Sequence, residues 1–135
     1  MIAVALPAGA LATAEAAVAT TCSTGQSCVW EDPNYQTNGN TFGKLPFVQY
    51  IPHFNQWSYQ GTSLSAHDNA SSMHNHGTQQ TVYYFKNDNC TGSSFSRGIN
   101  QTDGDFTNGT PTGNFDNTLD SGAFSAFVGA CLSAG

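Results

Sequence analysis

Hard oxygen ligands are concentrated in residues 66–75, which read Ala-His-Asp-Asn-Ala-Ser-Ser-Met-His-Asn. A carboxylate, hydroxyls and the free carbonyls of a turn are the ligand types that suit Ca²⁺. The same side chains also suit a plain turn, because Asp, Asn and Ser readily hydrogen-bond to nearby backbone. A degraded copy, Phe-Asp-Asn-Thr-Leu-Asp-Ser, follows at residues 115–121. The recurrence strengthens the calcium hypothesis, and the turn remains the alternative.

Three histidines, His67, His74 and His76, fall within ten residues. The spacing His74-x-His76 places two imidazoles on one face of an extended segment, which is compatible with a Zn²⁺ or Cu²⁺ site. No acid or thiolate completes the ligand set, so we favour solvent-exposed turn histidines. His67 would make calcium binding depend on pH.

The composition predicts one globular domain with little charge. The chain has 135 residues, of which 39% are hydrophobic and 9% charged, and its net charge is −6. The basic residues are Lys44, Lys86 and Arg97. Because three scattered cations cannot form a basic patch, we expect no nucleic-acid partner.

Residues 1–19 are typical of a secretory signal peptide without its charged n-region. An apolar run covers residues 3–11, and Ala17-Val18-Ala19 is a small-x-small cleavage site. A transmembrane helix is disfavoured, because the segment contains Pro7 and Glu15 and barely reaches spanning length. We therefore expect a secreted monomer with no membrane association once the signal is removed.

The four cysteines support export. An even set in a small exported chain predicts two disulfides, for which three connectivities exist. We favour Cys22–Cys28, which closes a small loop, and Cys90–Cys131, which ties the last strand to the second half. A Cys₄ zinc site is the alternative, but paired C-x₂-C spacing is missing.

Short stretches rich in β-formers predict an all-β sandwich or barrel. The expected strands are 27–30, 47–51, 81–85, 93–96 and 123–128, and almost nothing is typical of a helix. The expected loops are 33–44, 52–66 and 100–114, and the last is expected to be mobile because it has no apolar periodicity.

The chain also contains an internal duplication. Residues 30–37 align with residues 85–92, each with an aromatic side chain at the end of a strand followed by Asn- and Asp-containing polar residues. Each copy is followed by one of the two Asp-Asn stretches. The repeat predicts two Greek-key units, about 22–78 and 79–132, that pack into a single domain spanning 20–135.

Three motifs in this order resemble a known family: C-x₅-C-V-W-E-D-x-N-Y at 22–35, H-D-N-A-S-S-x-x-N at 67–75 and N-C-T-G at 89–92. The family is the actinobacterial secreted peptidase inhibitors typified by the Streptomyces metalloproteinase inhibitor, within the βγ-crystallin superfamily. The resemblance implies a Ca²⁺ site shared between the two units, with Asp68, the Asn69 carbonyl and Ser71 as ligands. A weaker second site would use Asp116, Asn117 and Asp120.

The chain departs from the superfamily pattern at several positions. His67 replaces an Asn or Asp, Thr37 replaces a corner glycine, and Cys90 replaces a corner aromatic residue. The second Asp-Asn stretch can be aligned in two registers. An alignment on Phe115 matches the first stretch residue by residue, whereas an alignment on Asp116 places Asp120 opposite Ser71. We favour the first register, which leaves at most one good site.

An enzyme is disfavoured, because the mature chain has a single glutamate, Glu31, and no G-x-S-x-G motif. The resemblance implies a secreted, non-enzymatic inhibitor of extracellular peptidases. One alternative is a Ca²⁺-stabilised structural or wall-associated protein. Another is a carbohydrate-binding module that uses Trp57 and Tyr59, which we expect to be exposed in the loop 52–61. The loops 33–44 and 52–61 are the candidates for the inhibitory surface.

Overall fold

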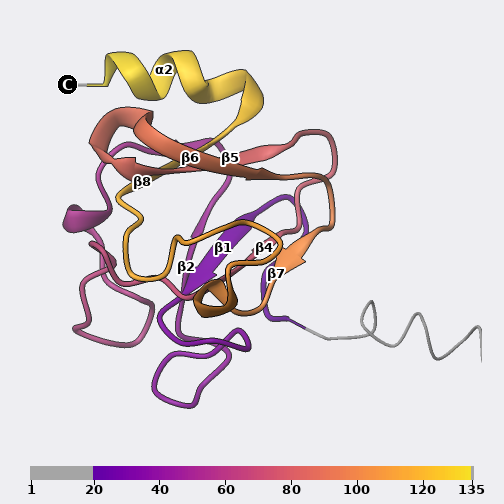
Figure 1. Ribbon diagram of the computed structural model, residues 1–135, viewed down its shortest axis with the longest axis vertical. Helices are drawn as coiled ribbons and strands as arrows, with labels where there is room; N and C mark the ends of the chain where they lie inside the picture. The colour runs from indigo at the N-terminus through magenta and orange to yellow at the C-terminus, as the bar shows by residue number, and fades with distance from the viewer. Residues whose placement is uncertain (1–19, 135) are drawn as a thin grey trace, which may run out of the picture.

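Two four-stranded antiparallel sheets face each other in the computed structural model, which describes residues 20–134 (Figure 1). The expected signal peptide, residues 1–19, lies outside the described residues. One sheet has the order β2-β1-β4-β7 and the other β3-β8-β5-β6. The strands are β1 Ser27–Trp30, β2 Lys44–Phe47, β3 Tyr50–Ile51, β4 Ser72–Asn75, β5 Val82–Asn87, β6 Thr91–Arg97, β7 Thr102–Asp103 and β8 Ser121–Phe124. Short 3-10 helices are η2 Phe54–Gln56, η3 Asp88–Cys90, η4 Phe106–Asn108 and η5 Ser125–Phe127, and α2 is Val128–Ser133.

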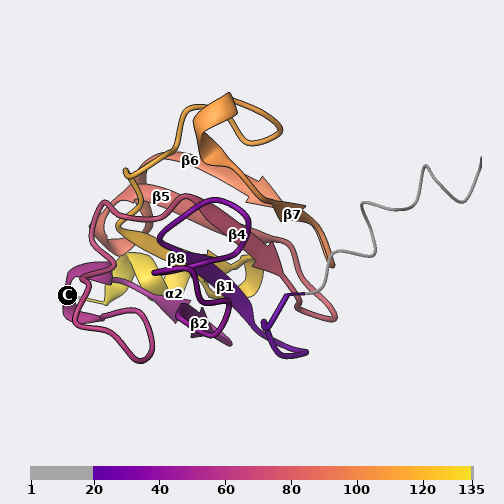
Figure 2. The same cartoon turned by 90° about the horizontal axis from the view of Figure 1, so that it is seen from below.

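Each half of the chain gives one edge strand to the other half's sheet. β3 comes from the first half and pairs with β8. β7 comes from the second half and pairs with β4 at the edge of its sheet (Figure 2). Each predicted unit thus supplies three strands to one sheet and one strand to the other. This exchange completes two Greek keys, so the predicted all-β sandwich is confirmed.

The core fills the space between the sheets with aliphatic and aromatic side chains. Val29 and Met73 from the first sheet belong to the same buried cluster as Tyr84 and Phe124 from the second. Because successive strand residues point to opposite faces, Trp30 lies on the outer side of β1 in a separate cluster. That cluster includes both cysteines of the Cys22–Cys28 disulfide, which covers the outer face of the strand.

Both predicted disulfides are present, Cys22–Cys28 and Cys90–Cys131. The second one holds α2 against the outer face of its sheet, where the helix contacts β3 and β8 (Figure 1). The prediction of a strand over 123–128 was wrong in its second part, because the chain turns into η5 and α2 after Phe124. A buried cysteine and the disulfide fix this short helix, which has no strong helix signal in the sequence.

The internal duplication is visible in the backbone. Asn34 and Tyr35 in the first corner have φ of 62° and 60°, and Asn89 and Cys90 in the second have φ of 57° and 56°. These pairs occupy equivalent positions when Trp30 is aligned with Phe85. Left-handed conformations are rare outside glycine and Asn, so four of them in matching places identify one repeated corner.

The segment 100–114, which we expected to be a mobile loop, is anchored to both units. It contains β7 and buries Phe106, whose backbone N–H donates to the Ser71 carbonyl at 2.9 Å. The buried carboxylate of Asp103 accepts hydrogen bonds from the Asp105 N–H at 2.9 Å and from the Thr112 hydroxyl at 2.6 Å. Turn residues satisfied by side chains, rather than apolar periodicity, order this segment.

Candidate functional site

The two Asp-Asn stretches meet across the middle of the molecule as a symmetric pair. The Asp68 N–H donates to the Leu119 carbonyl at 3.1 Å, and the Asn117 N–H donates to the Ala70 carbonyl at 2.9 Å. Asp68 and Asn117 both have a positive φ, 50° and 55°. Asp68 is therefore equivalent to Asn117. The register aligned on Asp116 is the correct one, and the register that we favoured from the sequence was wrong.

In this register each potential ligand faces a partner from the other unit. The Ser71 hydroxyl donates to Asp116 Oδ1 at 2.5 Å, and His67 Nδ1 lies 2.6 Å from Asp120 Oδ1. The expected ligands Asp68 and Ser71 are thus separated: Ser71 contacts Asp116, whereas the Asp68 N–H donates to Asp120 Oδ1 at 3.1 Å. The structure forms two polar pairs between the units, Asp116–Ser71 and His67–Asp120.

The His67–Asp120 pair is part of a cluster with Asp68, whose Oδ2 lies 3.5 Å from His67 Nε2. Single ligand atoms of these three residues lie within 4.8 Å of one another. Burial raises the pKa of the Asp120 carboxyl, the Asp68 carboxylate raises it further, and His67 acts in the opposite direction. An imidazole between two carboxylates offers nitrogen where Ca²⁺ prefers oxygen, so this cluster does not fit calcium.

The Asp116–Ser71 pair offers a carboxylate and a hydroxyl, which are the oxygen ligands that Ca²⁺ accepts. Asn69, the third expected ligand, lies near Tyr59: its carbonyl accepts a hydrogen bond from the Tyr59 hydroxyl at 2.7 Å. Its side-chain amide donates to the Ser65 carbonyl at 3.1 Å. Asn69 thus connects the stretch to the preceding loop.

The serines that end the two stretches have a structural role that the sequence analysis missed. The Ser72 hydroxyl donates to the Asp32 carbonyl at 2.7 Å and accepts from the Tyr35 N–H at 3.1 Å. Ser121 makes the same pair of contacts in the second corner, with the Asn87 carbonyl and the Cys90 N–H. Both serines are fully buried. In the sequence, the serine shared by the endings Ser71-Ser72 and Asp120-Ser121 could have indicated this structural role.

Tyr59 is fully buried, so its assignment as an exposed binding residue was wrong. Its ring belongs to the main core, and the loop folds over it because the Tyr59 N–H donates to the Leu64 carbonyl at 3.0 Å. Burial raises the pKa of the Tyr59 hydroxyl. Trp57 is 52% exposed, as expected.

The histidine pair is ordered rather than solvated. His74 and His76 stack with ring centroids 4.8 Å apart, and His74 is buried. Their Nδ1 atoms lie 2.5 Å from the Thr20 hydroxyl and 2.6 Å from the Cys22 carbonyl, respectively. Burial and then the neighbouring His76 lower the pKa of His74. The expectation of exposed turn histidines was therefore wrong for His74, which packs the N-terminal segment onto β4.

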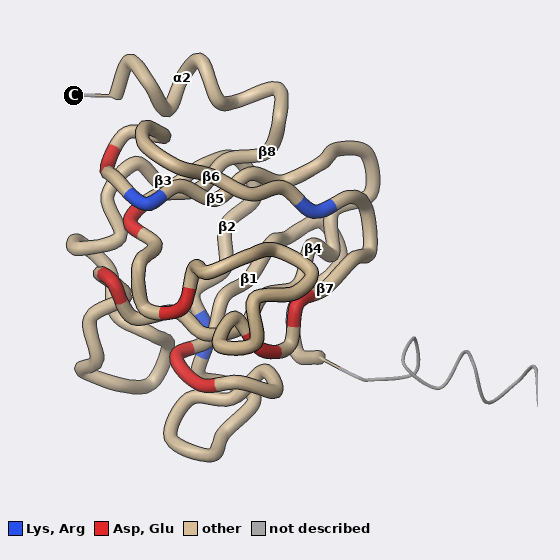
Figure 3. Tube along the Cα trace, in the orientation of Figure 1, with Lys and Arg blue, Asp and Glu red and all other residues tan. Residues whose placement is uncertain are grey.

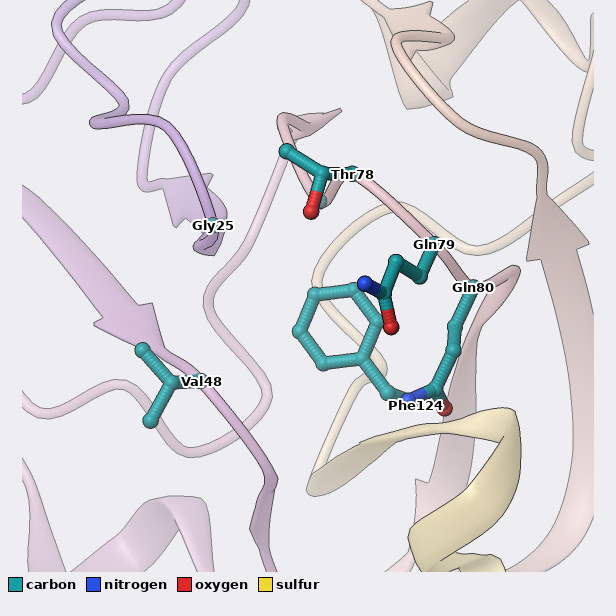
Figure 4. Close-up of a pocket in the computed structure, with 7 residues that line it drawn as sticks. Gly25, Val48, Thr78, Gln79, Gln80 and Phe124 are labelled. Carbon is teal, nitrogen blue, oxygen red and sulfur yellow. The ribbon is translucent and has the colours of Figure 1, made fainter.

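Two recesses lie in the surface formed by the described residues. One of about 370 Å³ lies between the loop that precedes β2 and the turn at Gly61, beside the exposed ring of Phe42. The other, of about 160 Å³, is bordered by Val48, Gln79 and Gln80 (Figure 4). Gln80 Oε1 already accepts a hydrogen bond from the Ala126 N–H at 2.8 Å, so part of this second lining is structural. Phe42 was not identified from the sequence, because it stands alone among polar residues and glycines.

Charge is dispersed over the surface. Figure 3 shows the basic residues at separate places, one in each of β2, β5 and β6. In the described part of the chain, no cysteine is free. Helices with the length and apolar character needed to cross a bilayer do not occur among residues 20–134.

Comparison with known proteins agrees with this geometry. The family model for peptidase inhibitor family I36 matches residues 15–96, which is more than half of the chain. A comparison with curated protein sequences gave no match.

Solved βγ-crystallins share the fold. A domain solved in work on the evolution of the eye-lens βγ-crystallin fold has a TM-score of 0.59 and 16% identity, covering 79% of this chain and 90% of that chain. A βγ-crystallin from Ciona intestinalis has a TM-score of 0.55 and 19% identity, covering 75% and 100%. A βγ-crystallin from an archaeon has a TM-score of 0.51 and 16% identity, covering 76% of this chain and 99% of that chain. At these identities the likeness establishes the fold alone.

The family match extends from before the first disulfide to the last residue but one of β6 and includes both corners and the first Asp-Asn stretch. The family is one of peptidase inhibitors, and the two-unit sandwich is the fold on which this member is built. The chain belongs to peptidase inhibitor family I36, is built on a βγ-crystallin fold, and is an inhibitor rather than an enzyme.

Proposed function

We propose that the protein is exported and blocks a peptidase outside the cell. Family membership carries the inhibitory activity. The extracellular setting is supported by the cysteines, since all four are paired and disulfides persist in oxidising compartments. The sequence of residues 1–19, typical of a signal peptide, supports the same location.

An inhibitor of this kind must survive contact with the enzyme that it blocks. Peptidases cleave chains that open locally or globally, so resistance requires a stable frame. On the chain-entropy model, the Cys90–Cys131 disulfide, with a sequence separation of 41, contributes about 4 kcal/mol. The Cys22–Cys28 disulfide, with a separation of 6, contributes about 2 kcal/mol.

The experiment is a titration of the purified, oxidised protein against secreted metallopeptidases and serine peptidases. Inhibition should be tight and stoichiometric, and mass spectrometry should recover the inhibitor chain intact. Inhibition of none of these enzymes would refute the proposal. Rapid cleavage of the chain in step with lost inhibition would identify a slow substrate instead.

We also propose that one Ca²⁺ binds at the Asp116–Ser71 pair. When bound, the ion would neutralise Asp116 and join the two units through oxygen ligands from both. Ligand at about a hundred times its Kd adds roughly 2.7 kcal/mol to stability. Thermal melts in EDTA and in millimolar Ca²⁺ should differ, and the difference should vanish in Asp116→Ala but persist in Asp68→Ala.

A calcium shift without inhibition of any peptidase would favour the alternative of a calcium-stabilised structural protein. The carbohydrate-binding alternative is weakened, because Tyr59 is buried and Trp57 alone remains of the expected pair. Retention on insoluble polysaccharide, lost in Trp57→Ala, would restore it.

A further inference from the structure

We propose that Phe42 is the anchor side chain that enters the specificity pocket of the target, and that the target is a peptidase accepting large apolar side chains. The inference rests on the proposed inhibition and adds the contact surface and the class of enzyme. Peptidases select their substrates largely by the side chain that fills such a pocket. A side chain that serves this purpose must be exposed, rigidly held and free of partners in the inhibitor itself.

Phe42 is exposed to an unusual degree for an aromatic residue. It is 68% exposed, compared with 52% for Trp57 and 61% for Val48. A large apolar side chain left in water gains free energy when a partner covers it. Aromatic residues of this kind dominate the binding energy of many protein interfaces.

Hydrogen bonds hold the backbone around Phe42 in place. The Phe42 N–H donates to Asn40 Oδ1 at 2.7 Å, and its carbonyl accepts from the Lys44 N–H at 3.0 Å. The preceding carbonyl, that of Thr41, accepts from the indole N–H of buried Trp30 at 2.9 Å. The hydroxyl of Thr21 donates to the same carbonyl. A preorganised anchor loses little conformational entropy on binding, which raises affinity.

The turn that leads into this loop is equally well defined. The backbone groups of Thr37 and Asn40 hydrogen-bond to each other in both directions, at 2.9 and 3.0 Å. Between them, Asn38 and Gly39 both have a positive φ, which is the two-residue hairpin that Asn-Gly favours. The Thr37 hydroxyl accepts from the Glu31 N–H at 3.0 Å, which ties the hairpin to the end of β1. The expected corner glycine is thus replaced by a separate hairpin, and Phe42 lies two residues beyond its last residue, Asn40.

A recess beside Phe42 can receive the rim of the partner's pocket. It measures about 370 Å³, within the range of natural binding sites, and it lies between the two loops predicted to carry inhibition. The Gln60 N–H donates to the Lys44 carbonyl at 2.9 Å and joins those loops. Among the described residues, the side-chain amides of Asn38 and Gln60 have no partner. Both border the recess, where they can bind backbone groups of a partner.

The lining of the recess also indicates the class of enzyme. Its residues are uncharged: Thr37, Asn38, Asn40, Phe42, Gly43, Gln60, Gly61 and Thr62. A peptidase that selects Lys or Arg presents a buried carboxylate in its pocket, and Phe42 would leave that charge unpaired. An apolar pocket gains by burying the ring. The excess of acidic over basic residues adds repulsion toward an acidic pocket.

The test compares inhibition constants of the wild type, Phe42→Ala, Phe42→Leu and Val48→Ala. Val48 is a matched control, because it is similarly exposed but lies beyond the opposite end of β2. Chymotrypsin, subtilisin and thermolysin represent enzymes with apolar pockets, and trypsin represents basic specificity. We expect Phe42→Ala to raise the inhibition constant at least about 30-fold, as hot-spot truncation does. Phe42→Leu should retain most inhibition, and Val48→Ala should match the wild type. Equal melting temperatures would show that the variants are folded.

The outcomes separate this inference from the proposed function. Wild-type inhibition that is unchanged in Phe42→Ala would overturn the Phe42 surface and leave the proposed function intact. Inhibition of trypsin alone would overturn it as well. Inhibition of no enzyme would overturn both proposals together.

Discussion

Replacing Ser72 by Ala separates the structural and ligand roles of two adjacent serines. The substitution removes a hydroxyl that bridges the Asp32 carbonyl and the Tyr35 N–H inside the first corner. A buried donor left without an acceptor costs about 1–3 kcal/mol, and the second lost hydrogen bond adds about 0.5–1.5 kcal/mol. We expect a loss of about 3 kcal/mol. For a domain of this size that lowers the melting temperature by about 12 °C, at about 4 °C per kcal/mol.

Ser71→Ala is the matched control, since it removes the same hydroxyl one residue earlier. Ser71 donates only to half-buried Asp116, which water can solvate after the change. The expected loss in EDTA is about 1 kcal/mol or less. Urea denaturation with a common slope would measure both values. A loss in Ser72→Ala that is no larger than the loss in Ser71→Ala would refute the assignment of Ser72 as the corner's structural residue.

Two further substitutions test the contribution of a disulfide to stability and the effect of a raised carboxyl pKa on it. Replacing Cys90 and Cys131 together by Ala should lower the free energy of unfolding by about 4 kcal/mol, measured by urea denaturation. Burial and then the charge of Asp32 raise the pKa of Glu31. Because the pKa is higher in the folded state, protonation of Glu31 favours folding. This stabilisation is fully present below the carboxyl pKa of the unfolded chain and is lost as the pH rises through the folded pKa. Glu31→Gln should therefore melt above the wild type at pH 7 and match it below about pH 4; an equal difference at both pH values would contradict this cause.

Much of the fold could be predicted because its signals are local or repeated. Strand β1 was predicted with its observed limits, and the duplicated corners were identified from an aromatic residue followed by Asn and Asp. That the four cysteines form two disulfides followed from their even number, whereas the observed pairing was the favoured one of three connectivities. Each of these features depends on residue types within a short window or on simple parity.

The register of the second stretch could not be predicted from local likeness. Asp116-Asn117 copies the letters of Asp68-Asn69, yet the backbone equates Asp68 with Asn117. Both residue types tolerate the left-handed conformation, so residue identity does not reveal which of them adopts it. The decisive information is the pairing of Ala70 with Asn117 across the interface of the two units.

The exposure of side chains within loops also could not be predicted from the sequence. Trp57 and Tyr59 lie two residues apart in a polar segment, but one is exposed and the other fully buried. The difference arises because the turn at Gly61 folds the segment back onto the core, a long-range packing effect. Phe42 was missed for the same reason: nothing in its neighbours distinguishes a presented side chain from a buried one.

The exchange of edge strands between the two halves of the chain is relevant to how the protein withstands a peptidase. Each sheet takes an edge strand from the other half, and both polar pairs, Asp116–Ser71 and His67–Asp120, join residues of different halves. Opening of either half would disturb the other half's sheet and these polar contacts, which raises the free energy of opening. Cleavage that depends on such opening is slowed accordingly. Phe42 lies outside these crossed contacts, on a loop where it can bind a partner without weakening the structure that resists cleavage.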